Sequence, residues 1–228
     1  MSLMKLVFKV SRMSAAAVAG YLIGSVMTAD IVAKAANGRR KEAVDLRAKG
    51  SGNPGGMNAM GELGKLYGVA VIVGDVAKGA VGAQAGRIIA GDNGAYAAAT
   101  AAVVGHCFPA TSGFRGGKGV ATSLGSTLAV FPLYAPVDLA IALLGYVTTK
   151  RASISTFIAS STFVLLSFLW WWRKLPNGWG PRPTAGLPVF AVLTSAVIAY
   201  KFLTSPAEGS HIEDEVDERA ADAGADAA

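Results

Sequence analysis

Long apolar stretches separated by short polar segments run through most of the chain. A helix that crosses a membrane needs about 20 mostly apolar residues, and such stretches occur at residues 13–36, 66–90, 94–110, 154–172 and 185–203. The apolar stretch at 120–149 is too long for one crossing and contains Pro132 and Pro136, so it predicts two short spans. The pattern predicts an all-α polytopic membrane protein with about seven transmembrane helices and re-entrant or cytoplasmic glycine-rich loops.

The composition agrees with a membrane protein. Hydrophobic residues make up 52% of the 228 residues and charged residues 16%, against roughly 25% charged residues in soluble domains. The 28 glycines suit helices that approach one another closely. The first apolar stretch continues without a clean cleavage site before it, which indicates an uncleaved first span rather than a signal peptide.

The charges are unevenly distributed. Residues 208–228 carry eight carboxylates, one arginine and no aromatic residue, so we expect an acidic disordered tail after a transmembrane domain at 1–207. The residues before the tail hold 20 of the 21 Lys and Arg and 7 of the 15 Asp and Glu, a net charge of +13. Because these cations lie in short loops between apolar stretches, they favour anionic lipid headgroups and not nucleic acid.

Seven spans place eleven cations on one side of the membrane and seven on the other. The positive-inside rule then predicts a cytoplasmic location for the first side and an external N terminus. Three polar loops fall on the predicted cytoplasmic side: KGSGNPGGMNAM, GFRGGKG and TTKRASIST.

The segment GFRGGKG, Gly113 to Gly119, interrupts two apolar stretches. Glycine-rich backbone with an embedded lysine, here Lys118, is typical of phosphate-binding loops, because amide dipoles and a cation converge there without side-chain obstruction. No Ser or Thr follows the lysine, so the segment is not a Walker A loop. The alternative is a basic cytoplasmic turn. The candidate substrate-binding residues are Arg115, Gly116, Gly117 and Gly119.

The segment SGNPGGMN, Ser51 to Asn58, has a composition suited to an anion-binding nest of backbone amides. With Gly50 it also matches G-x-G-x-x-G, but a charged loop and not a strand precedes it, which argues against a dinucleotide fold. A plain flexible loop is the alternative. The candidate site residues are Ser51, Asn53 and Asn58.

Several ionisable residues lie within or beside the apolar stretches. Asp75 and Lys78 are three residues apart on one helical face, and a neutralising pair is favoured over direct substrate contact. His106 is a candidate general base or a structural hydrogen-bonding residue. In KRASIST, Arg151, Ser153 and Ser155 indicate phosphate donors or helix caps.

Several enzyme classes lack their signatures in this chain. The acyltransferase pattern H-x-x-x-x-D has Thr111 in the place of the aspartate, and G-x-S-x-G is absent. Cys107 is the only cysteine, so the chain has no internal disulfide bond, and two histidines with one cysteine do not make a His/Cys zinc site. We expect neither a metal nor a cofactor.

Together these stretches resemble the bacterial acyl-phosphate:glycerol-3-phosphate acyltransferases, the PlsY family of inner-membrane enzymes. GSGNPGGMNAMGELGKLYG is similar to the family's first motif and GHCFPATSGFRGGKGVATSLG to its second, while GDVAKG and RASIS have counterparts as well. The resemblance implies seven spans, transfer of an acyl group from acyl-phosphate to glycerol 3-phosphate, and lysophosphatidic acid as product. It also implies phosphate binding by Ser51 and the Lys118 loop, with hydroxyl donors at Ser153 and Ser155.

The family's third motif, H-R-E-N-I, has no counterpart in this chain. The matching region reads YKFLTSPAEGSHIEDE, in which His211 has a different spacing. Two hypotheses follow: an acyltransferase that uses glycerol 3-phosphate or a related acceptor, with the hydroxyl activated by the phosphate itself or by His106, and a degenerate relative that binds phosphate or lipid as the partner of another membrane protein, with the acidic tail as docking segment.

Overall fold

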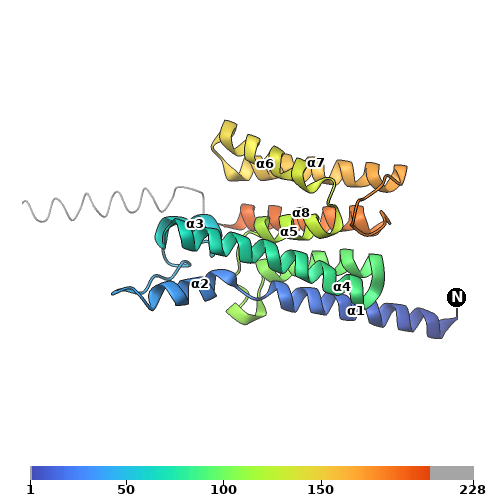
Figure 1. Ribbon diagram of the computed structural model, residues 1–228, viewed down its shortest axis with the longest axis horizontal. Helices are drawn as coiled ribbons and strands as arrows, with labels where there is room; N and C mark the ends of the chain where they lie inside the picture. The colour runs from blue at the N-terminus through green and yellow to red at the C-terminus, as the bar shows by residue number, and fades with distance from the viewer. Residues whose placement is uncertain (1, 206–228) are drawn as a thin grey trace, which may run out of the picture. The chain divides into compact units, whose positions relative to one another are not determined.

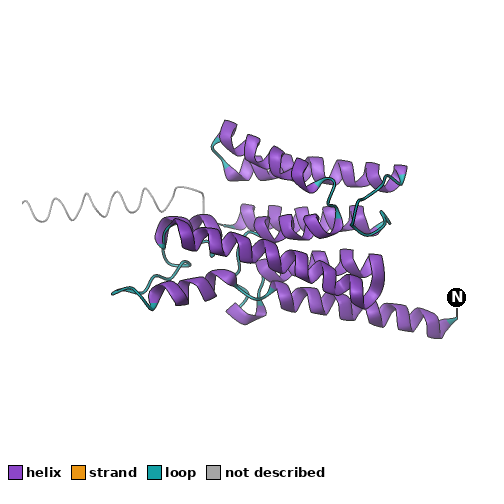
Figure 2. Cartoon of the chain, viewed as in Figure 1, coloured by secondary structure: helices purple, strands orange, loops and turns teal. Residues whose placement is uncertain are grey.

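The computed structural model describes residues 2–205, and every regular element in that range is a helix (Figures 1 and 2). The predicted tail at 208–228 lies outside the described residues. The helices are α1 (Leu3–Gly24), α2 (Thr28–Asn37), α3 (Gly56–Glu62), α4 (Lys65–Cys107), the short 3-10 helix η1 (Ala110–Ser112), α5 (Val120–Val130), α6 (Ala135–Thr149), α7 (Ala152–Arg173) and α8 (Gly186–Thr204).

Four helical stretches in the described part are long and apolar enough to cross a membrane, and α5 and α6 are shorter apolar helices. The 43-residue α4 is broken at Ala90 and Gly91, where φ is −135° and 69°. With α4 counted as two helices, residues 2–205 contain seven apolar helical segments, in agreement with the seven predicted. Pro132 lies between α5 and α6 and Pro136 lies in the first turn of α6, so the predicted division of 120–149 into two short helices is confirmed.

The boundaries predicted for the first span are wrong. The prediction was 13–36, whereas α1 begins ten residues earlier, at Leu3, and ends at Gly24. The chain breaks before α2 because carbonyls in the break bind distant side chains. The Ser25 carbonyl accepts a hydrogen bond from Thr111, and the Val26 carbonyl accepts one from Lys78 over 2.8 Å.

The chain forms two compact units, of which the first comprises residues up to Met27 and Val73–Leu203. Its core is rich in aromatic side chains, with Phe131 and Tyr134 stacked at 5.1 Å between ring centroids and Tyr134 and Phe163 at 5.5 Å. In this unit α6 and α7 form an antiparallel hairpin (Figure 1). Their outward residues, such as Leu144 and Leu165, are exposed and apolar, as expected of a surface that faces lipid.

Glycines let α1 and α4 approach within backbone contact. A Cβ atom on Gly20 would overlap the backbone of Ala98, and a Cβ atom on Gly24 would overlap that of Ala102. The two contacts are one helical turn apart on each helix, so they form a continuous line that we call the glycine seam. Small residues at such positions allow the close van der Waals packing that holds membrane helices together.

The second unit consists mainly of Thr28–Ile72. Its apolar core includes Ala36 of α2, Leu46 of the following loop, Ala59 of α3, Leu63 at the C-cap of α3, and Val71. This core supports the long loop at 38–55, which contains part of the predicted phosphate-binding sequence.

Candidate active site

Residues 108–119 connect α4 to α5 at one end of the first unit. The Tyr21 hydroxyl donates a hydrogen bond to the Phe108 carbonyl over 2.8 Å, and the Thr111 hydroxyl donates one to the Ser25 carbonyl. Both bonds tie the connection to the C-terminal end of α1. The connection, which carries GFRGGKG, therefore has a fixed place beside α1.

Glycines permit the tight path of this connection. Gly113 and Gly119 have φ angles of 59° and 87°, in the left-handed region that favours glycine. Gly116 lies directly against the carbonyl of His106, and a Cβ atom on Gly119 would collide with the Cys107 sulfur. Side chains at these two positions would displace the loop from the end of α4.

The residues that precede α5 are mostly glycines, so the main chain at the N-terminal end of that helix is not covered by their side chains. Gly117 and Gly119 are buried, and Gly119, as the N-cap residue of α5, offers no side-chain acceptor to the first amides of that helix. Such amides have no partner within their own helix, and with the helix dipole they favour a bound anion. Arg115 is exposed in the same loop.

Two lysine side chains add positive charge to the loop. The Nζ atom of Lys118, which is half-buried, lies 4.5 Å from the centre of the Phe202 ring. Lys201 of α8 donates a hydrogen bond from Nζ to the Gly116 carbonyl over 3.2 Å and lies 5.3 Å from the centre of the Phe108 ring. The loop thus combines main-chain amides with two ammonium groups, a combination suited to phosphate.

The first turns of α7 lie at this same end of the unit. The Phe157 ring is 6.3 Å from the Phe202 ring, which in turn contacts Lys118. Two of the three predicted polar loops, GFRGGKG and the α6–α7 turn, therefore come together.

The candidate residues of the α6–α7 turn have different surroundings. Arg151 is exposed. Ser155 is buried, and its hydroxyl donates a hydrogen bond to the Ala142 carbonyl. This bond links α7 to α6. Ser153 is half-buried, and within residues 2–205 its side chain makes no hydrogen bond. Of the two hydroxyls, that of Ser153 is therefore the better placed to meet a ligand.

Three buried ionisable side chains lie beneath the segment Gly113–Gly119, which we call the glycine loop. Lys78 Nζ is 2.9 Å from Asp75 Oδ1, and the two side chains are 7% and 3% exposed. The predicted neutralising pair is thus confirmed. The buried His106 has its Nδ1 atom 3.5 Å from the same Asp75 oxygen. Asp75 and Lys78 lie near the start of residues 73–107, the part of α4 that belongs to the first unit, and His106 lies near their end. Lys78 also donates to the Val26 carbonyl, so the cluster links both ends of this part of α4 to the residues that follow α1.

In the second unit, Asn58 of α3 organises the loop that contains Ser51. Its Oδ1 atom accepts a hydrogen bond from the Ser51 amide over 3.0 Å, and its Nδ2 atom donates to the carbonyls of Leu46 and Lys49 over 2.9 and 3.1 Å. The side-chain amide of Asn58 is thus occupied by the loop itself. Ser51 is exposed and Asn53 is half-buried.

Two further contacts fasten this loop. Arg47 and Asp30 form a two-bond ion pair, with distances of 2.5 and 3.1 Å. Asn37 and Val44 exchange two hydrogen bonds of 3.0 and 2.9 Å. A loop with so many anchors presents Ser51 in a defined position.

The sequence interpretation missed three contributors to the site. Lys201 counts in the sequence interpretation only among the eleven cations of the predicted cytoplasmic side, because a lysine at the end of an apolar helix commonly extends toward the lipid headgroups. Nothing in the sequence around Phe202 indicates its contact with Lys118, and nothing around Tyr21 indicates its hydrogen bond to the Phe108 carbonyl.

Comparisons with known proteins agree with this geometry. The family model described as glycerol-3-phosphate acyltransferase matches residues 14–207. Two similar proteins are the glycerol-3-phosphate acyltransferases of Thermoanaerobacter pseudethanolicus and Clostridioides difficile. The first is 40% identical over 155 residues, covering 68% of this chain and 76% of the relative. The second is 38% identical over 191 residues, covering 80% and 84%.

Two crystal structures of PlsY, an integral membrane glycerol 3-phosphate acyltransferase, have a similar fold. The glycerol 3-phosphate form has a TM-score of 0.70 and 30% identity, and the match covers 84% of this chain and 88% of the other. The lysophosphatidic acid form has a TM-score of 0.68 and 29% identity, with 83% and 87% covered. A family match over most of the chain, with relatives of this identity and coverage, shows that the chain belongs to the glycerol-3-phosphate acyltransferase family.

Proposed function

We propose that the protein transfers an acyl group from an acyl-phosphate to the 1-hydroxyl of glycerol 3-phosphate, forming lysophosphatidic acid for phospholipid synthesis. The observation that carries this proposal is the similarity to an integral membrane acyltransferase whose crystal structures are a glycerol 3-phosphate form and a lysophosphatidic acid form. Both substrates of the reaction are anionic, and the glycine loop offers amides and ammonium groups for anions.

The donor phosphate binds at the glycine loop in this proposal. The backbone of residues 116–119 and the first amides of α5 receive its oxygens, and Lys118 compensates its charge. Lys201 holds the loop through the Gly116 carbonyl. Donors already in place before the reaction stabilise a developing charge without reorganisation, and here that charge grows on the phosphate that leaves.

The acceptor's phosphate is assigned to the remaining polar candidates. In the first unit these are Arg151 and Ser153 at the α6–α7 turn, which supply guanidinium and hydroxyl donors. Ser51 and Asn53 remain a separate phosphate-binding prediction within the second unit. Two anion sites that hold both substrates give the proximity on which a metal-free acyl transfer depends.

The chemical step needs one bond to form and one to break. The acceptor hydroxyl oxygen attacks the acyl carbonyl carbon, the carbon–oxygen bond to phosphate breaks, and the hydroxyl proton passes to the departing phosphate. Between the two bases considered from the sequence, the phosphate is favoured over His106. The His106 side chain is 4% exposed, and its Nδ1 atom faces Asp75, so it supports the loop from beneath.

A direct test uses purified protein with an acyl-phosphate and radiolabelled glycerol 3-phosphate. We expect labelled lysophosphatidic acid, and a loss of at least a hundredfold in Lys118→Met. Lys5→Met, which removes an exposed cation of α1, is the matched control and should retain full activity. If the unmodified protein forms no product, the proposed reaction is wrong.

A binding function without catalysis is the second candidate, and the sequence after α8 favours it. That region has no H-R-E-N-I motif, and the proposed docking segment at 208–228 lies outside the described residues. A Lys118→Met variant that loses acyl transfer in membranes would exclude a binding-only role. Removal of 208–228 without loss of any co-purified membrane protein would exclude the partner.

The bacterial inner membrane, with the glycine loop facing the cytoplasm, is the proposed location. Eleven predicted loop cations against seven support this orientation. Reporter fusions after Leu203 and before Leu3 test it, with a cytoplasmic signal expected for the first fusion and an external one for the second. The opposite pair of signals would reverse the orientation.

A further inference from the structure

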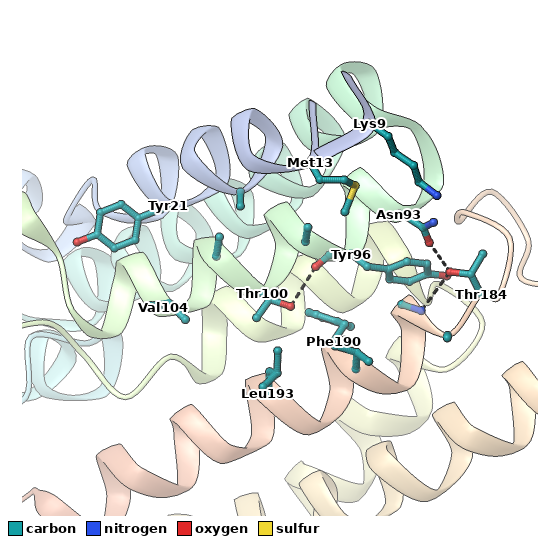
Figure 3. Close-up of a pocket in the computed structure, with 16 residues that line it drawn as sticks. Lys9, Met13, Tyr21, Asn93, Tyr96, Thr100, Val104, Thr184, Phe190 and Leu193 are labelled. Carbon is teal, nitrogen blue, oxygen red and sulfur yellow. Dashed lines mark hydrogen bonds between the residues drawn. The ribbon is translucent and has the colours of Figure 1, made fainter. Parts of the chain in front are cut away.

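An apolar groove of about 710 Å³ lies between α1, α4 and α8 in the first unit (Figure 3). Its walls include Met13 and Ala17 of α1, Ala97 and Ala101 of α4, and Leu193 of α8. The small side chains of α1 and α4 leave the space open, while the neighbouring glycine seam holds the same two helices together. A volume of this size is within the range of ligand pockets, roughly 300–1,000 Å³.

The groove is elongated along the helices. Met13 and Tyr21 both line it, and eight residues of helix correspond to about 12 Å. Tyr21 and Val104 mark one end, and Lys9, Asn93 and Thr184 mark the other (Figure 3). An apolar groove of this length suits a hydrocarbon chain.

The two ends differ in chemistry. Tyr21 connects its end to the connection that carries the glycine loop, because its hydroxyl donates to the Phe108 carbonyl. The Lys9 end lies at the opposite end of the unit, where Arg12 donates to the Ile89 carbonyl over 2.6 Å. The groove therefore extends along the helices from the end near the glycine loop toward the opposite end of the first unit.

Polar donors are gathered at the Lys9 end. The Thr184 hydroxyl donates to Asn93 Oδ1 over 2.6 Å and accepts from the Gly186 amide over 3.1 Å. This arrangement fixes the Asn93 side chain and leaves Nδ2 as its donor. Lys9 is exposed, and no carboxylate among residues 2–205 forms an ion pair with it. An ammonium and an amide at the mouth of an apolar groove are complementary to an anionic head with a hydrocarbon chain.

We propose that this groove binds an anionic phospholipid from the leaflet opposite the glycine loop, with one acyl chain between α1, α4 and α8 and its phosphate at Lys9 and Asn93. The lipid is a bound partner and not a substrate, because its phosphate lies at the far end from Lys118. The headgroup position at Lys9 and Asn93 uses no residue of the candidate active site, although Tyr21 lines the far end of the groove. The lipid proposal can therefore fail while the proposed function holds.

Native mass spectrometry of the delipidated protein in detergent tests this proposal, with phosphatidylglycerol and phosphatidylcholine of equal chain length as probes. We expect phosphatidylglycerol to bind more tightly. Lys9→Gln should reduce its binding roughly fivefold, the value of one basic residue near a membrane surface, with little effect on phosphatidylcholine. Ala17→Leu, which narrows the groove, should reduce the binding of both lipids.

Two matched variants serve as controls, and each should bind both lipids as the unmodified protein does. Lys5→Gln removes an exposed cation one turn before Lys9, and Ala15→Leu enlarges an exposed residue of α1 outside the groove. Equal binding of the two lipids, or an unchanged Lys9→Gln, would overturn the proposal. So would an Ala17→Leu variant that keeps phosphatidylglycerol but has a higher KM for acyl-phosphate, because the groove would then hold the donor's chain.

Discussion

The buried pair of Lys78 and Asp75 offers the sharpest test of how this fold is held together. Lys78→Met keeps most of the side-chain volume but leaves the Asp75 carboxylate, 3% exposed, without its partner at 2.9 Å. Removing one member of a buried ion pair costs about 3–5 kcal/mol, because the remaining charge stays desolvated. Part of that cost, about 1 kcal/mol, is the lost hydrogen bond to the Val26 carbonyl.

The double variant Asp75→Asn with Lys78→Met separates these contributions. Without the carboxylate no unpaired charge remains, so we expect a loss of about 1–2 kcal/mol. For a chain of this size 1 kcal/mol corresponds to about 2–4 °C in Tm. The single variant should therefore melt roughly 6–20 °C lower and the double variant roughly 2–8 °C lower.

The single cysteine provides the assay. Cys107 is fully buried, so a thiol-reactive fluorophore labels it when the first unit opens during heating in detergent. Lys5→Met is the control and should melt within about 1 °C of the unmodified protein. If Lys78→Met melts as the control does, or if the double variant melts as low as Lys78→Met or lower, the pair does not carry the energy assigned to it.

Three further predictions concern the loops. Gly116→Ala should lower the rate of acyl transfer about 5- to 150-fold, because its Cβ atom would overlap the His106 carbonyl. Gly61→Ala is the control, since Gly61 has open space around it, and equal activity of the two variants would contradict the packing argument. Asn58→Ala removes three hydrogen bonds and should raise tryptic cleavage within 38–55 on the order of 10–100-fold, whereas unchanged cleavage would mean that other anchors suffice. Lys201→Met should reduce kcat/KM for acyl-phosphate roughly 10- to 100-fold, because the hydrogen bond to the Gly116 carbonyl of the glycine loop is lost. Lys201→Arg should recover part of the activity. An equal loss in the two variants would argue against a role of Lys201 as hydrogen-bond donor to the loop.

Helix content and most helix boundaries follow from local physics, which is why the sequence predicts them. Pro132 and Pro136 cannot occupy a helix interior, and the division of 120–149 into α5 and α6 occurs there. Asp75 and Lys78 are costly inside an apolar helix unless they are paired, and they are paired. In each case the information is contained within a few consecutive residues.

The remaining features depend on contacts between residues far apart in the chain. The end of α1 is determined by side chains from α4 and from the following connection that bind the carbonyls of Ser25 and Val26. The bond from Lys201 to Gly116 joins residues 85 positions apart. No local pattern distinguishes such a lysine from one that faces the lipid headgroups, so this part of the site needed coordinates.

The glycine seam has a consequence for the mechanical behaviour of the protein. Main-chain atoms meet there directly, so the contact contains no side-chain rotamers that heat or a change of lipid could rearrange. Helices joined in this way keep a constant distance between their axes and move relative to each other only as rigid bodies. The width of anything enclosed beside them is then set by the backbone, and the fit for a hydrocarbon should change little between fluid and stiff membranes.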